Sequence, residues 1–525
     1  MVERNGGRTA RHRYGEAGTP RVIVVGAGVG GIASGVKLRR AGINTFTIYE
    51  KSPSLGGTWF DNSYPGCEVD VGSYLYSFSF KQNYPWTRTH AKQPEILRYL
   101  ETVVDDYDLR PHMRLGIAVE RAVWDEATHE YEVHLADGTI DRGHVLISAV
   151  GFLNVPRYPD WPGLDGFEGP KFHTFHWEHE HDLTGKTVAI VGTGSTASQI
   201  VPMLAPRVEH LYLFQREPGW IIPKGDRDYT AEELARFRSP VHRRLARIKL
   251  YQWLEMANFA RAIYRSGTKV NDTLEKICRD FIEAELGDRP DLRDAVTPDY
   301  PFPGKRPLFN STFYAALKRD NVTLVPHAVA AVTPAGVVDI TGTERPADVL
   351  VIATGFQPTN YLAHLPVTGR DGRTIQEVWN GEPDAFLGVM VPGFPNFFML
   401  YGPNTNGGEI IFLEEHQAGI AVRETRRMMR RGATAVEVRR SWYDRYNRWI
   451  QRKMEGTSWL VSNNYFKTAS GKVVTQWPYG ALFYGLLTHT IGRYATTVRG
   501  CDATRAVTSV PEEVDRVVAS AAGGG

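Results

Sequence analysis

The sequence predicts an α/β protein built from two Rossmann-like dinucleotide-binding domains, of which the second is inserted in the first. Residues 22–50 have the pattern of a buried strand, a glycine-rich turn, a helix and a second strand, and the same order recurs at residues 187–217. Two more apolar strands, at 145–151 and 348–355, end in glycine and are followed by proline within a few residues. Such a strand end is typical of a chain that leaves one domain for another.

These strands set the expected domain boundaries. The second domain is predicted to carry a polar, arginine-rich helical insertion at about 230–295. Both ends of the chain are poor in apolar residues and are expected to be mobile. The expected segments are, in chain order, the N-terminal segment at 1–20, the first part of the first domain at 21–150, the second domain at 151–345, the second part of the first domain at 346–500 and the C-terminal tail at 501–525.

Composition excludes several classes of protein. The 525 residues carry 61 Lys+Arg against 59 Asp+Glu, a net charge of +2 that is too balanced for a nucleic-acid partner. No apolar run reaches the ~18 residues that span a bilayer, and the first residues lack a signal-peptide core. The three cysteines, Cys67, Cys278 and Cys501, form no CxxC motif, which argues against a disulfide framework, a zinc ribbon and a dithiol reductase. We therefore expect a cytoplasmic protein without an integral membrane segment, and the sequence leaves its oligomeric state open.

The glycine turn of the first domain has the spacing of a dinucleotide cradle. Gly26, Gly28 and Gly31 form GxGxxG directly after a strand and before a helix. The first glycine makes the tight turn, the second lets the backbone approach a pyrophosphate, and the third allows close packing of helix and strand. The pyrophosphate then sits on the helix N-terminus, while Glu50, at the end of the next strand, can bond ribose hydroxyls.

A second cradle follows in the second domain. It is Gly192-x-Gly194-x-x-Ala197, and Arg216 lies as far beyond Gly192 as Glu50 lies beyond Gly26. An acid at this position would repel a 2′-phosphate, whereas arginine pairs with it in a bidentate fork. The first cradle therefore suits FAD and the second NADP, although Glu217 could blunt this preference and Arg216 could instead be a solvated surface residue. The turn residues assigned to the same coenzyme are Thr193, Ser195 and Thr196.

Two longer motifs bear on the chemistry. Residues 56–70 read GGTWFDNSYPGCEVD, and residues 167–178 read FEGPKFHTFHWE. Together they resemble the two signatures of the Baeyer–Villiger monooxygenases, and the resemblance runs from about residue 21 to 490. Glu178 stands where that family has Pro or Asp, and related flavin-containing monooxygenases usually have another aromatic residue at the Trp177 position. The positions that match are Gly56, Gly57, Trp59, Tyr64, Pro65, Gly66 and Asp70 in the first signature and Phe167, Gly169, His173 and Trp177 in the second.

The resemblance implies an NADPH-dependent, FAD-containing enzyme that converts a ketone and O2 to an ester or lactone through a C4a-peroxyflavin. It maps Arg306 to the arginine beside the flavin and Lys305 to a residue that helps hold the NADP phosphate. Asp70 would hold and partly neutralise Arg306, which stays a cation because arginine is not deprotonated in proteins. Trp459 maps to a mobile loop that closes over cofactor and substrate. The cofactor-binding assignment also includes Gly57, Thr58, Trp59, Asp70, Tyr76 and Val119.

Three features are assigned no chemistry. Glu68 departs from relatives that carry a basic or small residue near the nicotinamide. His173 is expected to align the domains rather than to transfer protons. The neighbouring histidines alternate with acids, which indicates a solvated strip rather than a metal site, so we expect no metal.

Other classes of function remain open at this stage. A flavin monooxygenase that oxidises sulfur or nitrogen is the nearest alternative and would be favoured if Arg306 were remote from the flavin. A pyridine-nucleotide reductase is less favoured because the redox dithiol that such enzymes often use is missing. A catalytically silent flavin-binding protein is a third alternative, which rapid bleaching of bound flavin by NADPH would exclude.

Overall fold

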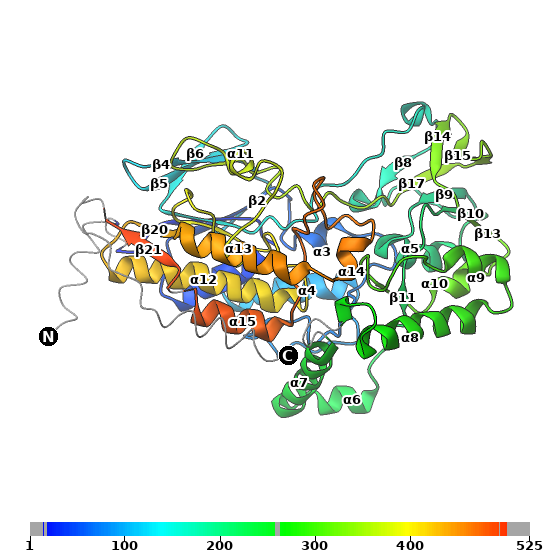
Figure 1. Ribbon diagram of the computed structural model, residues 1–525, viewed down its shortest axis with the longest axis horizontal. Coiled ribbons are helices and arrows are strands. Elements are labelled where there is room, and N and C mark those ends of the chain that lie inside the picture. The colour runs from blue at the N-terminus through cyan, green and yellow to red at the C-terminus, as the bar shows by residue number, and fades with distance from the viewer. Residues whose placement is uncertain (1–13, 15–17, 258–262, 493, 501–525) are drawn as a thin grey trace.

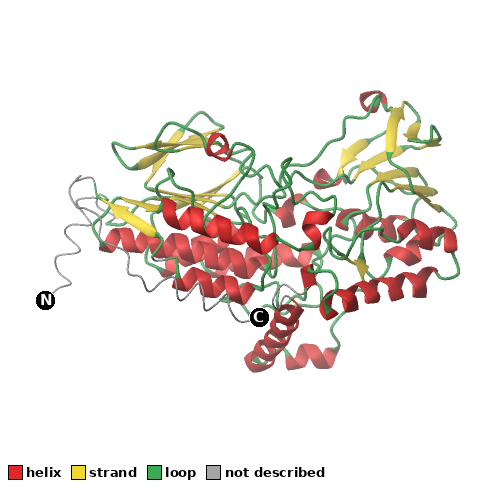
Figure 2. Ribbon diagram, in the orientation of Figure 1, coloured by secondary structure: helices red, strands yellow, loops and turns green. Residues whose placement is uncertain are grey.

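The fold was derived from a computed structural model that describes residues 14, 18–257, 263–492 and 494–500. The expected N-terminal segment 1–20 thus lies mostly outside the described residues, and the expected C-terminal tail lies outside them entirely. Two lobes, each with a parallel sheet, are visible in Figure 1, and long helices pack against the first of them. Figure 2 shows that both lobes mix helices and strands, as the α/β prediction requires.

The first sheet belongs to the domain of the first cradle. In the described chain it has five parallel strands in the order β19-β7-β1-β2-β3. The central strand β1 is buried along its whole length, which is why its sequence VIVV lacks polar residues. Helix α2 follows it, and α12 packs along α2. The bounds are β1 Val22–Val25, α2 Val29–Arg40, β2 Phe46–Glu50, β3 Met113–Leu115, β7 Val145–Ser148, β19 Phe397–Met399 and α12 Ile410–Arg430.

The second sheet repeats this plan. The described residues give five parallel strands in the order β13-β10-β9-β17-β8, and helix α5 starts directly after the second glycine turn. The insertion of one domain in the other is confirmed, since β19 returns to the first sheet after β17 has paired in the second. The bounds are β8 Lys171–His173, β9 Thr187–Val191, α5 Ser195–Leu204, β10 His210–Phe214, β13 Val322–Val325 and β17 Val349–Ile352.

One domain boundary differs from the expectation. Residues from 346 onward were assigned to the first domain, but β17 pairs with β9 and β8 of the second sheet. This strand is apolar and completely buried, so its place is set by pairing between strands distant in sequence rather than by its own pattern. The chain therefore returns to the first domain only after β17 ends at Ile352.

The region expected as a helical insertion holds four helices among its described residues. On α8 the buried side chains Cys278, Ile282 and Leu286 recur at helical spacing, so one face packs inward. Arg247 of α7 donates hydrogen bonds to the carbonyls of Tyr74 and Ser77 and so joins the insertion to the first domain. No helix in the described ranges is both long and apolar enough to cross a bilayer. The bounds are α6 Ala231–Arg236, α7 Pro240–Ala257, α8 Lys269–Leu286 and α9 Pro290–Val296.

Smaller sheets and helices complete the described chain. An antiparallel sheet and the β18 strand cover the first domain, and a three-stranded antiparallel sheet flanks the second. The bounds of these sheets are β4 Val119–Asp125, β5 Glu130–Leu135, β6 Ile140–Gly143, β18 Val367–Thr368, β14 Val329–Thr333, β15 Gly336–Asp339 and β16 Glu344–Pro346. The remaining elements are α3 Thr58–Asp61, α4 Gln93–Asp106, β11 Ile221–Ile222, β12 Leu308–Phe309, α10 Phe313–Leu317, α11 Ile375–Trp379, β20 Ala435–Val438, α13 Arg440–Met454, α14 Ser458–Val461, α15 Ala481–Thr490 and β21 Thr496–Arg499.

Candidate active site

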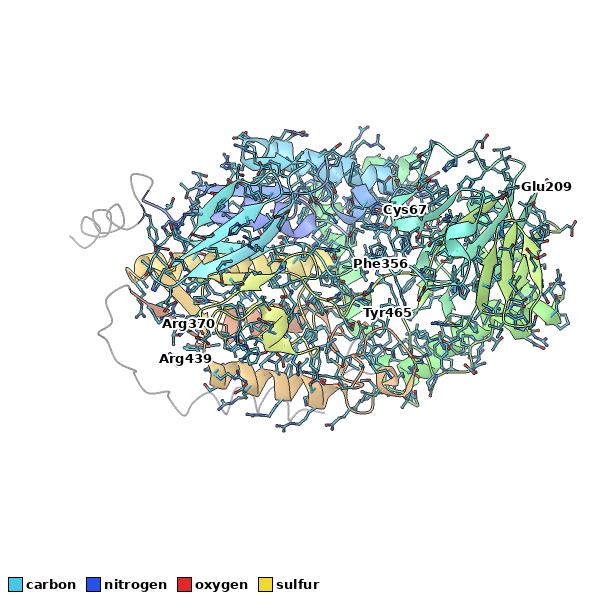
Figure 3. The ribbon with its side chains drawn as sticks, turned by 90° about the horizontal axis from the view of Figure 1, so that it is seen from above. Cys67, Glu209, Phe356, Arg370, Arg439 and Tyr465 are labelled. Atoms are coloured by element: carbon cyan, nitrogen blue, oxygen red, sulfur yellow. The ribbon has the colours of Figure 1, made fainter. Side chains whose placement is uncertain are left out.

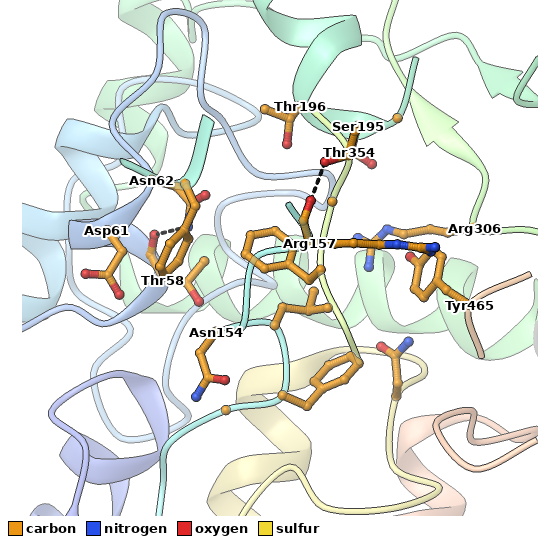
Figure 4. A pocket seen from close by; sticks show the side chains of 18 of the residues that line it. Thr58, Asp61, Asn62, Asn154, Arg157, Ser195, Thr196, Arg306, Thr354 and Tyr465 are labelled. Atoms are coloured by element: carbon orange, nitrogen blue, oxygen red, sulfur yellow. Dashed lines mark hydrogen bonds between the residues drawn. The ribbon is translucent and has the colours of Figure 1, made fainter. Parts of the chain in front are cut away.

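A cleft of about 1200 Å³ is lined by residues of both domains. Both glycine turns open into it, as expected where strands end at the carboxyl edges of parallel sheets. Figure 3 shows Cys67, Phe356 and Tyr465 in the middle of the molecule, between the two lobes, whereas Glu209, Arg370 and Arg439 lie toward its two ends. Figure 4 shows the cleft from close by, with side chains from both domains around it.

The first cradle has the geometry that a dinucleotide phosphate needs. Gly26 has φ +105°, and a Cβ there would lie 2.5 Å from the carbonyl oxygen of Ala149. At Gly31 a Cβ would collide with the carbonyl of Gly26, so the helix approaches the turn too closely for a side chain. Helix α2 begins at Val29, which leaves the free N–H groups of its first turn at the cleft. The cradle therefore fits FAD.

Glu50 lines the cleft at the end of β2 and also holds the turn in place. Its carboxylate accepts hydrogen bonds from the backbone N–H groups of Ala27 (2.7 Å) and Ser52 (2.9 Å). Glu50 is 6% exposed, so two charge-assisted bonds compensate its burial. Its position beside the first cradle suits the predicted contact with ribose hydroxyls.

The second cradle has the same construction. Gly192 has φ +114°, and a Cβ there would collide with the carbonyl of Ala353. At Gly194 no described atom lies within 4 Å of the place that a Cβ would take, so the backbone is open to a ligand. The three assigned turn residues line the cleft, and so do Arg216 and Lys305.

Arg216 and Lys305 form the cationic end of this cradle. Burial and the nearby Arg216 charge lower the pKa of Lys305. Lys305 lies over the Tyr300 ring at 4.7 Å and forms an ion pair with Glu217. Two neighbouring cations repel each other, and a bound phosphate dianion would relieve this repulsion by pairing with both. Glu217 competes with such an anion for Lys305.

We expect Arg216→Ala to weaken NADPH binding selectively. Loss of a charge-assisted pair costs ~1.5–3 kcal/mol, so the Michaelis constant for NADPH should rise by about tenfold or more. Arg207→Ala is the matched control, because Arg207 is an exposed arginine of the same domain outside the cleft lining. Steady-state kinetics with NADPH and NADH check this, and an unchanged constant for NADPH would show that Arg216 does not bind the 2′-phosphate.

Arg306 and Asp70 meet across the two domains. Arg306 Nη2 donates to Asp70 Oδ2 at 2.7 Å, and both residues line the cleft. The Arg306 side chain is 41% exposed and the Asp70 side chain 15%. Burial opposes the charge on Arg306, while the Asp70 carboxylate and its hydrogen bond favour it together with nearby phenols, so on balance the pKa of the guanidinium is raised and it stays a cation. Figure 4 shows Arg306 beside Tyr465.

The first-domain side of the cleft is lined by four residues that the sequence analysis assigns to cofactor binding, namely Thr58, Trp59, Tyr76 and Val119. Trp59 Nε1 donates to the Tyr76 hydroxyl at 2.9 Å, and the two rings meet edge to face with centroids 5.5 Å apart. Burial raises the pKa of Tyr76, so its hydroxyl is neutral. This arrangement gives the cleft an aromatic wall beside the first cradle.

Glu68, which had no assigned role, forms an interdomain ion pair. Lys224 Nζ lies 2.7 Å from Glu68 Oε1, and the side chains are only 1% and 12% exposed. Gln199 of α5 donates to the Glu68 carbonyl at 3.1 Å and accepts from the Tyr64 hydroxyl at 3.1 Å. The first signature thus holds the second domain through this buried charge pair, hydrogen bonds to Gln199 and the Arg306–Asp70 pair.

Unlike the first signature, the second signature packs within the second domain at β8. A Cβ at Gly169 would collide with the carbonyl of Asp348, and His173 ends β8, which pairs with β17. His173 is 1% exposed, its Nδ1 accepts from the N–H of Phe175, and burial lowers its pKa to about 4. Among the described residues, those that line the cleft do not include the four matching positions of this signature, Phe167, Gly169, His173 and Trp177. These contacts lie within the second domain, so the alignment of the two domains by His173 stays a prediction.

Trp459 differs from the expectation. It is 2% exposed and packs against Tyr264 with ring centroids 4.2 Å apart, and within the described chain it is not among the residues that line the cleft. The apolar contact with the insertion holds the indole away from the cofactor sites. Asn464 and Tyr465, a few residues later in the same loop, line the cleft instead.

The histidine strip contains one group of side chains with metal-ligand spacing. Glu178, Glu180 and His181 place their ligand atoms within 4.8 Å of one another, and Glu180 is exposed. His181 Nε2 lies 3.0 Å from Glu178 Oε2, so these two already pair. The absence of a metal stays a prediction.

Sequence reasoning missed the residues of the cleft that come from the end of the first sheet and from α12. Tyr401 has φ +54°, and its hydroxyl donates to Asn406 at 2.8 Å. Glu409 caps the N-terminus of α12, Glu414 lies near the start of this helix, and both line the cleft. No local pattern distinguishes these acids from surface glutamates, because their burial arises from packing against distant segments.

Two dinucleotide cradles that share one cleft define a pyridine-nucleotide-dependent flavoprotein. The family described as pyridine nucleotide-disulphide oxidoreductase matches residues 23–293, just over half of the chain. A Baeyer–Villiger monooxygenase of Streptomyces coelicolor is 40% identical over 87% of this chain and 88% of its own. The structure of OTEMO in complex with FAD and NADP superposes with TM-score 0.83 at 27% identity, over 91% of this chain and all of that one. Cyclohexanone monooxygenase of Rhodococcus sp. Phi1 bound to NADP+ gives 0.81 at 29% identity, over 92% and 99%.

The chain belongs to the Baeyer–Villiger monooxygenase family. It is a flavin-dependent monooxygenase that uses FAD and NADPH, and the predicted family, fold class, enzyme class and cofactors are confirmed. This family membership favours the monooxygenase over the reductase, and rapid bleaching of bound flavin by NADPH is the measurement that would exclude a silent binding protein.

Proposed function

We propose that this cleft inserts an oxygen atom beside the carbonyl of a ketone and that Arg306 and Asp70 carry the reaction. The observation that supports this is the Arg306–Asp70 pair on the wall of a cleft that both cradles share. When bound, FAD and NADPH supply the reducing equivalents and activate O2. The ketone as small-molecule partner and the cytoplasmic location are part of this proposal.

The chemistry of carbonyl attack needs a fixed cation. Negative charge develops on the attacking oxygen and then on the former carbonyl oxygen, within a cleft that cofactor and substrate keep poor in water. The Arg306 guanidinium is charged at every working pH and presents N–H donors to the cleft. It therefore stabilises both anions without giving up a proton.

Asp70 positions that cation. It holds Nη2 of Arg306 at 2.7 Å, so the other guanidinium donors point to the cleft in a fixed orientation. It also reduces the net charge of the site, which keeps Arg306 from trapping small anions. Tyr401 and Tyr465 border the same guanidinium, and burial raises the pKa of both phenols, so they add no charge.

The test is NADPH oxidation with linear, cyclic, aromatic and polycyclic ketones and, in parallel, with sulfides and tertiary amines. We expect at least one class of ketone to stimulate NADPH oxidation and to yield an ester or lactone that has gained one oxygen atom. Products limited to sulfoxides or N-oxides would support the alternative in which the enzyme oxidises sulfur or nitrogen. That reaction forms no carbonyl oxyanion, so a fixed cation would have none to stabilise.

A further inference from the structure

Glu414 is a buried acid at the wall of the FAD cradle. It lies on α12, is 7% exposed and lines the cleft. Its Oε2 is buried and has no hydrogen-bond partner among the described residues. The same oxygen would lie 3.3 Å from a Cβ at Gly30, so it abuts the first turn of α2. This turn presents its free N–H groups to the FAD pyrophosphate.

An ionised carboxylate does not suit this place. No described cation pairs with Glu414, and the bound pyrophosphate brings further negative charge to the same turn. A protonated carboxyl does suit it, because its O–H is a donor that a phosphate oxygen can accept. An acid kept neutral by an apolar environment can serve as such a donor near neutral pH.

We propose that Glu414 binds FAD as a neutral acid, donating a hydrogen bond from its carboxyl group to the phosphate of the cofactor. Glu414 is thus a positioning residue that joins α12 to the cofactor held by α2. Gly30 is part of the same contact, since a Cβ there would crowd this carboxyl group as well as Leu400 and Ala149.

Three titratable groups face Glu414. Glu409, which caps the N-terminus of the same helix, accepts hydrogen bonds from the N–H groups of Ile411 and Phe412, and burial raises its own pKa to about 8. Tyr76 and Tyr401 face it from two other segments, and burial raises the pKa of both phenols, so they are neutral. Burial, and then the charge of Glu409, raises the pKa of Glu414 to about 8. The neutral acid therefore predominates below pH 8 and is lost as the pH rises above it.

The test is the affinity of FAD for the apoprotein between pH 6.5 and pH 9, followed by flavin fluorescence. Because FAD binds the protonated form, the dissociation constant of the wild type should rise about tenfold from pH 7 to pH 9. Glu414→Gln keeps a donor and cannot ionise, so its constant should be close to the wild-type value at pH 7 and nearly independent of pH. Glu409→Gln is the matched control and should keep the pH dependence, with its midpoint moved to lower pH because the Glu409 charge no longer raises the pKa of Glu414.

A second measurement needs no variant. Calorimetry in buffers of different ionisation enthalpy should show that FAD binding at pH 9 takes up close to one proton. The proposal is overturned if Glu414→Gln keeps the wild-type pH dependence, if Glu409→Gln abolishes it, or if FAD binding takes up no proton at pH 9. Because these readouts concern FAD binding alone, their outcome is independent of the substrate proposed above.

Discussion

Arg306→Ala should leave NADPH oxidation running while ester formation collapses. Hydride transfer to the flavin does not require a fixed cation, whereas attack on the carbonyl moves negative charge onto a new oxyanion. Removing one preorganised group of this kind typically costs ~10²–10³ in rate. The oxygen should then leave as H2O2. The measurement is ester formed and H2O2 released per NADPH consumed, on any accepted ketone.

Two further variants sharpen this test. Arg306→Lys should also be poor, because a compact ammonium cannot hold Asp70 and face the cleft with the same planar fork. Asp70→Ala should lower the yield of ester per NADPH as well, since the guanidinium loses its fixed orientation. Arg319→Ala is the control, as Arg319 is an exposed arginine outside the described cleft lining. Equal ester yield per NADPH in wild type and Arg306→Ala would mean that Arg306 does not control the oxygen transfer.

The parts of the site that sequence predicted are those in which local backbone geometry sets the function. At Gly26 and Gly192 a positive φ and a facing carbonyl leave room for glycine alone, so the motif and the geometry coincide. Arg306 and Asp70 lie far apart in sequence, and their pairing came from resemblance to a family rather than from any local pattern.

The rest depends on contacts between distant segments. The pattern of β17 shows a buried strand but not which sheet it joins, so the predicted boundary at 346 came too early. Trp459 was placed at the cofactors, yet its environment is set by Tyr264 of the insertion. Glu414 looks like any helical glutamate in the sequence, and only packing against α2 buries it.

Lys224→Met should be the most destabilising single change at the domain interface. It leaves Glu68 charged and only 12% exposed without its partner at 2.7 Å. Breaking a buried ion pair from one side costs ~3–5 kcal/mol. Because Glu68 lines the cleft and water can reach it, we expect about 3 kcal/mol, measured by urea unfolding with saturating FAD. Lys276→Met is the control, since the exposed Lys276–Asp280 pair should contribute under ~1 kcal/mol.

The double variant Lys224→Met with Glu68→Leu separates charge burial from packing. Replacing both members of a buried pair by apolar residues of similar size is often neutral, so most of the lost stability should return. Lys224→Met should also raise the NADPH Michaelis constant, because the second domain loses a polar contact that orients it. The double variant should keep this raised constant, although Gln199 still bonds the backbone carbonyl at position 68. A double variant as unstable as Lys224→Met would show that the pair acts through Lys224 packing rather than through charge. Full recovery of both stability and coenzyme binding would show that the pair does not align the domains.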